Sequence, residues 1–302
     1  MSGTIPKTAM LLAAGLGTRM RPLTDNMPKP LIEVGGKALI DWTLDQIAEA
    51  GVETAVVNVH HKAQMLTDHS RGRDKPKIFI SDETALLLDT GGGVVKALPL
   101  LGDAPFFVLN CDGILLGRPI ESLMRIWKPD EIDIAMLVHP RETAHGFDGA
   151  GDFFVDETGH LERRGKANAA PFVYAGAYIL HPRVLKNRTP EPFSMNEIWD
   201  KAITAGRMKA VVHAGEWFHV GTPDAVGKTD AALRARGPQN LKRGVTWHRR
   251  NPPCSPSHHI CRSSMRSLKA FCMTPGMIRL RCRRSPFFCR RGARAVQCVK
   301  RF

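Results

Sequence analysis

The sequence predicts an α/β protein with a mostly parallel sheet that is covered by helices on both faces. In the first 140 residues, short apolar runs alternate with stretches of helical periodicity, and the first run ends at a glycine loop, as a buried parallel strand should. After residue 140, shorter strand-like runs are separated by turn signals such as Glu157-Thr158-Gly159. This change of pattern favours a small antiparallel lobe beside the parallel sheet.

The expected elements follow from these patterns in chain order. A helix over 38–50 is supported by five apolar residues on one face and by Gly51 as a stop signal. The other helices are expected at 92–101, 120–127, 196–205 and 223–235. Strands are expected first at 8–13, 54–59, 77–80, 105–110 and 132–138, and then at 152–155, 160–163, 172–180, 209–213 and 217–220.

The distribution of charge divides the chain near residue 238. The 302 residues carry a formal net charge of +14, but residues 241–302 contain 16 Lys and Arg side chains and no Asp or Glu. The preceding 240 residues therefore hold 27 basic and 29 acidic side chains, a near-neutral composition. We expect a globular domain over 1–238 and a disordered basic tail over 239–302. The domain itself gives no reason to expect a nucleic-acid partner.

The cysteines follow the same division, because six of the seven lie in the tail and are too widely spaced for a C-x2-C zinc pair. The tail is interpreted as a product of out-of-frame or read-through translation. The alternatives are a nucleic-acid or membrane-surface tether and a metal or disulfide module. Cys111, the one cysteine before it, fits a reducing compartment. Since no run reaches the roughly 18 apolar residues of a membrane span, we expect a cytoplasmic protein without a membrane partner.

The strongest chemical signal lies between residues 11 and 31. A predicted strand runs into the loop Gly15-Leu16-Gly17-Thr18-Arg19, and Pro28-Lys29-Pro30-Leu31 follows. Glycines let backbone N–H groups approach a phosphate chain closely. Arg19 offers a planar fork for phosphate oxygens and Lys29 a compact second charge. The third glycine of a dinucleotide fingerprint and the lysine of a Walker A loop are absent, which argues against both of those motifs.

This stretch resembles the L-A-A-G-x-G-T-R and P-K-P-L signature of the sugar-nucleotidyltransferase (NDP-sugar pyrophosphorylase) family, and the resemblance covers residues 8 to about 235. It implies a Rossmann-like sheet with a sugar-binding lobe. It also implies Mg²⁺-assisted nucleotidyl transfer from a nucleoside triphosphate to a sugar 1-phosphate. In that reading Arg19 contacts the leaving pyrophosphate and Lys29 the α-phosphate. The triphosphate and base would be held by Ala13, Ala14, Gly15, Gly17 and Thr18.

Two further motifs extend the resemblance. The segment Leu88-Asp89-Thr90-Gly91-Gly92-Gly93 is similar to the E-T-G-G-G stretch of the uridylyltransferase branch acting on N-acetylmuramate 1-phosphate, with Asp89 in place of glutamate. Glycines at a helix start can form an anion or base-edge site, and the resemblance implies that Gly91 and Gly92 contact the base. Asn110-Cys111-Asp112 matches the family's N-x-D, which implies Asn110 in the nucleotide site and Asp112 as a ligand of the metal ion.

The chain departs from the family pattern in two places. After Asp112 the branch continues with a tryptophan and a further aspartate, and the segment Gly113-Ile114-Leu115-Leu116-Gly117 has neither. His219 stands where the family has its other metal-binding aspartate. Asp112 and His219 are thus the candidate metal residues, and an imidazole nitrogen suits Mn²⁺ or Co²⁺ better than Mg²⁺. The residues expected near the sugar are Asp152, Gly176 and Asn196.

The substrates expected from the resemblance are UTP and N-acetylmuramate 1-phosphate, in the recycling of cell-wall sugars. One alternative is a mannose 1-phosphate guanylyltransferase or another hexose 1-phosphate nucleotidyltransferase. A second alternative, motivated by Gly113 and His219, is a non-catalytic regulatory domain that binds nucleotides.

Overall fold

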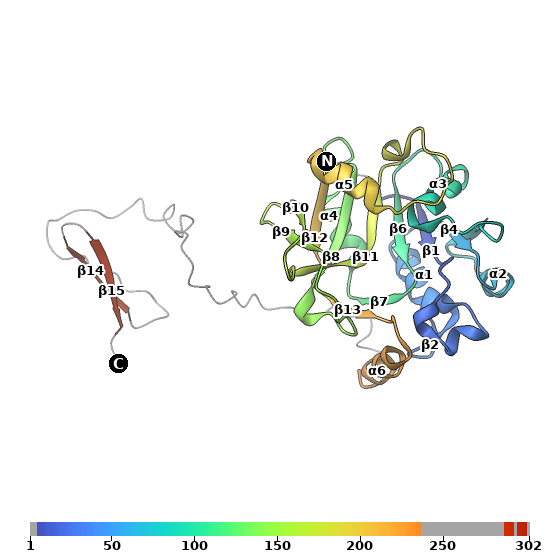
Figure 1. Cartoon of the computed structure of the whole chain (residues 1–302), viewed down its shortest axis with the longest axis horizontal. Coiled ribbons are helices and arrows are strands. Elements are labelled where there is room, and N and C mark those ends of the chain that lie inside the picture. The colour runs from blue at the N-terminus through green and yellow to red at the C-terminus, as the bar shows by residue number, and fades with distance from the viewer. Residues whose placement is uncertain (1–4, 237–286, 293–294, 301–302) are drawn as a thin grey trace. The chain divides into compact units, whose positions relative to one another are not determined.

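The computed structural model describes residues 5–236, 287–292 and 295–300 of the chain. The predicted mostly parallel sheet is confirmed (Figure 1). Its centre consists of four parallel strands in the order β6, β1, β4 and β5. These strands are β1 (Thr8–Leu12), β4 (Thr54–Val59), β5 (Lys77–Asp82) and β6 (Phe106–Asn110). The carboxyl ends of all four therefore point to one edge of the sheet.

The antiparallel part continues the same nine-stranded sheet. Strand β11 (Phe172–Leu180) runs antiparallel to β6 along one edge and to β8 (Ile134–Pro140) along the other. Strand β8 also pairs in parallel with β12 (Met208–Val212). The short strands β9 (Phe153–Val155) and β10 (Leu161–Arg163) extend the sheet beyond β11. The expected small antiparallel lobe is thus built onto the central sheet through β11.

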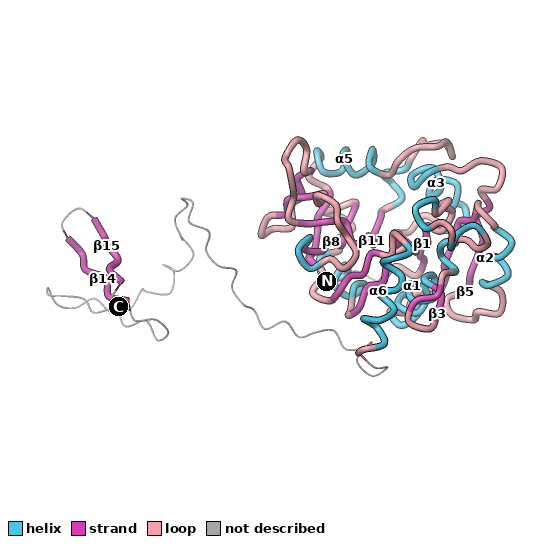
Figure 2. Tube along the Cα trace, turned by 60° about the horizontal axis from the view of Figure 1, so that its bottom comes forward, coloured by secondary structure: helices cyan, strands magenta, loops and turns pink. Residues whose placement is uncertain are grey.

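The helices cover both faces of the sheet, as predicted. One face packs against α1 (Leu39–Glu49), α2 (Ala63–Ser70) and α4 (Pro119–Ile126), and the other against α3 (Asp89–Leu101) and α5 (Asn196–Thr204). In Figure 2, α3 and α5 lie on the opposite side of the strands from α1. Because successive side chains of a strand alternate between faces, Ala9 and Leu11 of β1 join the first core and Met10 the second.

A third, smaller core lies beside the glycine loop and includes Met20, Trp42 and Phe218. It is enclosed by α6 (Pro223–Arg234) and by the two-stranded ribbon of β7 (Gly113–Leu116) and β13 (Glu216–His219). The remaining short elements are β2 (Glu33–Val34), β3 (Lys37–Ala38) and 3-10 turns at Thr18–Met20, Leu23–Asp25, Lys29–Leu31, Arg141–Thr143 and Pro182–Leu185.

The sequence analysis missed α2 and β7. Helix α2 buries only Leu66 and Ser70, so its apolar pattern is weak. Strand β7 is a four-residue segment that begins with a glycine, a sequence pattern typical of a loop.

The tail also contains two strands that were not expected, β14 (Phe287–Gly292) and β15 (Ala295–Lys300), which pair antiparallel. Both include β-favouring residues that the overall composition of the tail obscured.

The chain divides into two compact units, Met1–His248 and Arg249–Phe302. The expected boundary at residue 238 and the expected disorder over 239–286 lie outside the described residues. Within the described part, no helix has the length and apolar character that a membrane crossing requires.

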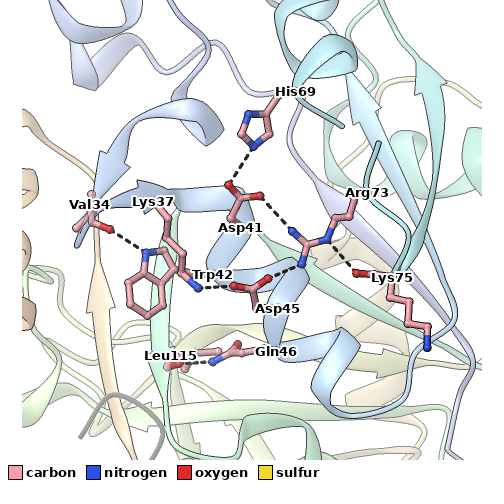
Figure 3. A network of polar contacts seen from close by, with 10 residues as sticks. All are labelled: Val34, Lys37, Asp41, Trp42, Asp45, Gln46, His69, Arg73, Lys75 and Leu115. Carbon is pink, nitrogen blue, oxygen red and sulfur yellow. Dashed lines mark hydrogen bonds and ion pairs between the residues drawn. The ribbon is translucent and has the colours of Figure 1, made fainter. Parts of the chain in front are cut away.

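A network of charges on α1 joins this helix to the chain around α2 (Figure 3). Arg73 forms ion pairs with both Asp41 and Asp45, and Lys37 lies 2.5 Å from Asp45. Burial raises the pKa of Asp45, but the hydrogen bonds from Lys37 and Arg73 outweigh it and hold that pKa below its usual value. Helix α1 also contacts the end of β6, because the Thr43 hydroxyl donates to the carbonyl oxygen of Asn110.

Two buried histidines lie between β8, β12 and the β7–β13 ribbon. His139 and His213 are 2% and 3% exposed, and their ring centroids are 6.0 Å apart. The Nε2 atom of His213 donates to the carbonyl oxygen of Leu116 at 3.0 Å, while the Nδ1 atoms of both rings have no partner among the described residues. Burial, with a smaller contribution from His139, lowers the pKa of His213 to about 4.

The burial of His213 predicts acid sensitivity. In the unfolded chain this imidazole takes up a proton near its ordinary pKa of about 6.5, whereas in the folded chain it does so only near 4. The unfolded state therefore binds more protons between these values, and the free energy of unfolding should fall on the order of 2 kcal/mol as the pH drops from 6.5 to 4. Urea denaturation across this range measures the loss.

The matched variant is His213→Gln, whose amide can still donate to Leu116 but does not titrate. Its stability should fall less steeply over the same pH range. Parallel stability curves for the two proteins would contradict the assignment of the acid sensitivity to His213.

Candidate active site

A cavity of about 630 Å³ opens at the carboxyl ends of β1 and β6, which is where open parallel sheets bind their ligands. Its walls are the glycine loop after β1, the segment after β6 and the start of α3. The structure brings together nine of the residues proposed from the sequence, and all nine line this cavity: Ala13, Ala14, Gly15, Gly17, Thr18, Arg19, Lys29, Asn110 and Asp112. Their individual contacts with a nucleotide remain predictions.

The two glycines of the glycine loop, Gly15 and Gly17, meet different structural requirements. A Cβ atom on Gly15 would meet no atom within 4 Å, so this residue borders open space in which a phosphate can approach the backbone. Gly17 has a φ of +63°, and a Cβ there would lie 2.8 Å from the side chain of Thr24. The Thr24 hydroxyl donates to the carbonyl oxygen of Gly17 at 2.9 Å and fixes the bend.

A buried polar chain holds this loop against the start of α3. The backbone N–H of Ala13 donates to Asn58 Oδ1 at 2.7 Å, and Asn58 Nδ2 donates to Glu83 Oε1 at 2.7 Å. The second oxygen of Glu83 accepts from the N–H of Leu88 at 3.1 Å. Asn58 is 3% exposed and Glu83 is not exposed at all. The sequence analysis missed both residues, although an asparagine inside the apolar strand 54–59 was a visible signal.

Gly91 and Gly92 do not line the cavity. A Cβ on Gly91 would lie 2.2 Å from the Phe193 ring, and one on Gly92 would lie 2.0 Å from the carbonyl oxygen of Glu191. These glycines therefore allow the segment before α5 to pack on α3, and the N–H of Gly91 donates to the carbonyl oxygen of Phe193 at 2.9 Å. Their predicted contact with the base remains a prediction.

Asp112 is surrounded by positive charge. Lys29 Nζ lies 3.3 Å from Asp112 Oδ2. Burial raises the pKa of Asp112, but the charge and hydrogen bond of Lys29, together with the charge of Arg19, outweigh it and hold this pKa below its usual value. The carboxylate is therefore ionised at neutral pH. Arg19 also lines the cavity and is exposed.

The β7–β13 ribbon places His219 opposite Gly113. A Cβ on Gly113 would lie 2.9 Å from the carbonyl oxygen of Phe218 and 3.0 Å from Trp217 Nε1, so any side chain here would crowd β13. The His219 ring lies 5.7 Å from the Trp217 ring and does not line the cavity. Burial lowers the pKa of His219, which keeps its imidazole neutral at pH 7.

The donor set around Asp112 limits how a metal ion is held. Among the described residues, no three His, Cys, Asp or Glu side chains are grouped to form a site of their own. Asp112 supplies one carboxylate, and His219 adds at most one neutral nitrogen. Mg²⁺ is commonly bound by one or two carboxylates together with substrate phosphates and water, so the residues present fit that mode of binding.

A second cavity of about 290 Å³ adjoins the first and shares four lining residues with it, Leu12, Asp89, Thr90 and Asn110. Asp152 and Asn196, two of the proposed sugar-binding residues, line it. Gly176 does not. It has a φ of +82° and lies in the β11 bulge, where its Cα faces the Asn110 side chain. Arg163 also lines this cavity, and sequence reasoning missed it.

The fold and the paired cavities are those of an α/β enzyme that joins a nucleotide to a second substrate. Residues 8–236 match the family model for nucleotidyl transferases, and the chain belongs to this family. The predicted family, fold and enzyme class are thereby confirmed, and the regulatory alternative has no support from the similar proteins, which are enzymes by name.

Several curated proteins are similar to this chain. It is 42% identical over 76% of its length to the N-acetylmuramate α-1-phosphate uridylyltransferase of Caulobacter vibrioides, and covers 97% of that protein. It is 34% identical over 71% of its length to the enzyme of the same name from Neisseria meningitidis, covering 93% of it. It is 30% identical over 78% of its length to the catalytic subunit beta of mannose-1-phosphate guanylyltransferase of Dictyostelium discoideum, covering 68% of it.

The fold is also that of solved structures with little sequence similarity. A UDP-glucose pyrophosphorylase in complex with UDP-glucose matches with a TM-score of 0.64 at 15% identity, covering 76% of this chain and 99% of that one. The inositol-1-phosphate CTP transferase of T. maritima matches with a TM-score of 0.62 at 19% identity, covering 77% and 96%.

The position of Asn58 predicts a coupled loss of stability and nucleotide binding. Asn58→Ala leaves the Ala13 N–H and one Glu83 oxygen without partners, and each lost buried hydrogen bond costs about 1–3 kcal/mol. We expect a lower free energy of unfolding and a higher KM for the nucleotide. Denaturation and steady-state kinetics check this, with the exposed Asn168→Ala as control. An unchanged KM would show that the loop keeps its shape without Asn58.

Proposed function

We propose that this protein transfers the uridylyl group of UTP to N-acetylmuramate 1-phosphate, forming UDP-N-acetylmuramate and releasing pyrophosphate. The main support is the similarity to two uridylyltransferases of that name, each covered over more than nine-tenths of its length. The two adjoining cavities support it physically, because they provide separate spaces for a nucleotide and a sugar that meet at Asn110.

The reaction needs no covalent intermediate with the protein. A phosphate oxygen of the sugar phosphate attacks the α-phosphorus of UTP, and the bond to the β-phosphate oxygen breaks as pyrophosphate leaves on the opposite side. Lys29 and Arg19 offset the negative charge that accumulates on the reacting phosphates. Two substrates held in line by the walls of the two cavities would react without most of the entropic cost of bringing them together.

A divalent cation completes this proposal. Bound by Asp112 and the triphosphate, Mg²⁺ would supply Lewis-acid neutralisation of the phosphate oxygens. His219 serves as a weak ligand or as a hydrogen-bond donor to a phosphate, depending on its tautomer. We further propose that residues 1–238 carry the whole activity. The protein would act in the cytoplasm, in the recycling of cell-wall sugars.

A mannose 1-phosphate guanylyltransferase is the second candidate, motivated by the 30% identity to the Dictyostelium enzyme. A pyrophosphate-release assay on the full chain separates the two. UTP, GTP, CTP and dTTP are each paired with the 1-phosphates of N-acetylmuramate, N-acetylglucosamine, mannose and glucose. The highest kcat/KM with UTP and N-acetylmuramate 1-phosphate supports the proposal. Better turnover with GTP and mannose 1-phosphate selects the second candidate, and no turnover with any pair rejects both.

The cavity charges predict the effect of removing them. Arg19→Ala and Lys29→Ala should each lower kcat/KM by about 100-fold or more, because each removes a cation placed to stabilise phosphate charge in the transition state. Circular dichroism should show an intact fold for Arg19→Ala, since its side chain is exposed. Lys128→Ala, which removes an exposed lysine paired with Glu131, is the control. Wild-type rates in either cavity variant would refute the phosphate-binding role of the loop.

The presence of His219 predicts an unusual metal preference. A nitrogen donor suits Mn²⁺ or Co²⁺ better than Mg²⁺, so Mn²⁺ should activate better than Mg²⁺ at equal concentration. His219→Asp should shift the preference towards Mg²⁺, and Asp112→Ala should abolish turnover with every metal. Activation curves and calorimetric titrations of metal with UTP measure both effects. If His219→Asp changes stability but not metal preference, the imidazole serves only in packing.

A further inference from the structure

The second cavity contains one basic side chain among its lining residues, Arg163. Its ionisable acidic residues are Asp89 and Asp152, and Asp152 Oδ2 accepts a hydrogen bond from the N–H of Tyr174 at 2.9 Å. An anionic group entering this space would therefore meet two carboxylates and a single cation. The position of that cation decides whether such a group is accepted.

Arg163 is held in place before any ligand arrives. Its guanidinium lies over the rings of Phe153 and Trp199, 4.9 and 5.6 Å from their centroids. Arg163 Nε donates to Asp200 Oδ1 at 2.7 Å, and Nη2 donates to Asn196 Oδ1 at 2.9 Å. Nη2 also donates to the carbonyl oxygen of Asn196 at 3.5 Å. A guanidinium fixed by aromatic faces and three hydrogen bonds loses little further entropy when it binds an anion.

One nitrogen of this guanidinium is open. Within the described residues, Arg163 Nη1 takes part in no hydrogen bond, and the side chain is 32% exposed. Arg163 is the last residue of the short strand β10 and lines the second cavity. The site can therefore accept one more anionic oxygen without breaking its existing contacts.

The chemistry of the proposed substrate supplies such an anion. N-acetylmuramate differs from N-acetylglucosamine by a lactyl ether whose end is a carboxylate. We propose that Arg163 binds this lactyl carboxylate and sets the preference for N-acetylmuramate 1-phosphate over N-acetylglucosamine 1-phosphate. This inference rests on the proposed function. Hydrogen bonds between an arginine and a carboxylate are among the stronger polar contacts, so one such contact can decide between two sugars.

The test compares the two sugar phosphates in the wild type, Arg163→Met and Arg163→Lys, with UTP as the nucleotide. Arg163→Met keeps the apolar stem and removes the charge. Its kcat/KM for N-acetylmuramate 1-phosphate should fall about 10- to 100-fold, mainly through KM, while that for N-acetylglucosamine 1-phosphate changes little. Arg163→Lys should recover part of the difference, because it keeps the charge without the planar fork.

Arg188→Met is the matched control. Arg188 also pairs with an acidic residue of α5, at 2.7 Å from Glu197, and lies over an aromatic ring, that of Phe193. It does not line the second cavity, so the variant should keep the selectivity of the wild type.

Three results decide the outcome. Equal losses with both sugars in Arg163→Met would assign Arg163 to the packing of α5 and overturn the inference alone. Unchanged selectivity in that variant would also overturn it. A wild type that turns over neither sugar with UTP would overturn the proposed function, and the inference with it.

Discussion

The carboxamide of Asn58 links the two segments that form the nucleotide cavity. A glycine loop cannot form the regular hydrogen bonds of a strand or helix, so its first N–H needs a partner from elsewhere. Asn58 provides that partner from the adjacent strand β4 and passes the connection to Glu83 and then to Leu88, at the start of α3. Since all these groups are buried, the loop and the helix cannot separate without exposing unpaired polar atoms.

Charge balance is the second constraint on the site. Asp112 is an acidic residue in a cavity whose other charges at that end are Lys29 and Arg19. The lysine pairs with this carboxylate, and the arginine is exposed. A polyphosphate with its cation can enter this arrangement by exchanging one set of ion pairs for another, which limits the cost of desolvating separate charges.

Much of the fold could be predicted from the sequence because the apolar runs of β1, β4 and β6 are long and buried on both faces. The loop from Ala13 to Arg19 could be predicted because its motif is local. Asn58 was visible as a polar residue in an apolar strand, but its bonds to Ala13 and Glu83 depend on tertiary neighbours that are far away in the sequence. The contact of Arg163 with Trp199 is hidden from the sequence for the same reason. Gly91 and Gly92 show that a matching motif need not line the cavity. In this structure they allow close packing against Phe193 and Glu191.

Strand β11 belongs to both halves of the molecule at once. It pairs with β6, which ends in the nucleotide cavity, and with β9, which borders the second cavity. The bulge at Gly176 separates these two sets of pairings. The strands β9 and β10 do not pair with any of the parallel strands β6, β1, β4 and β5, so their residues that face the second cavity can change with little effect on those strands. A common nucleotide-handling half can in this way be combined, over evolutionary time or in a designed library, with many different acceptor sugars.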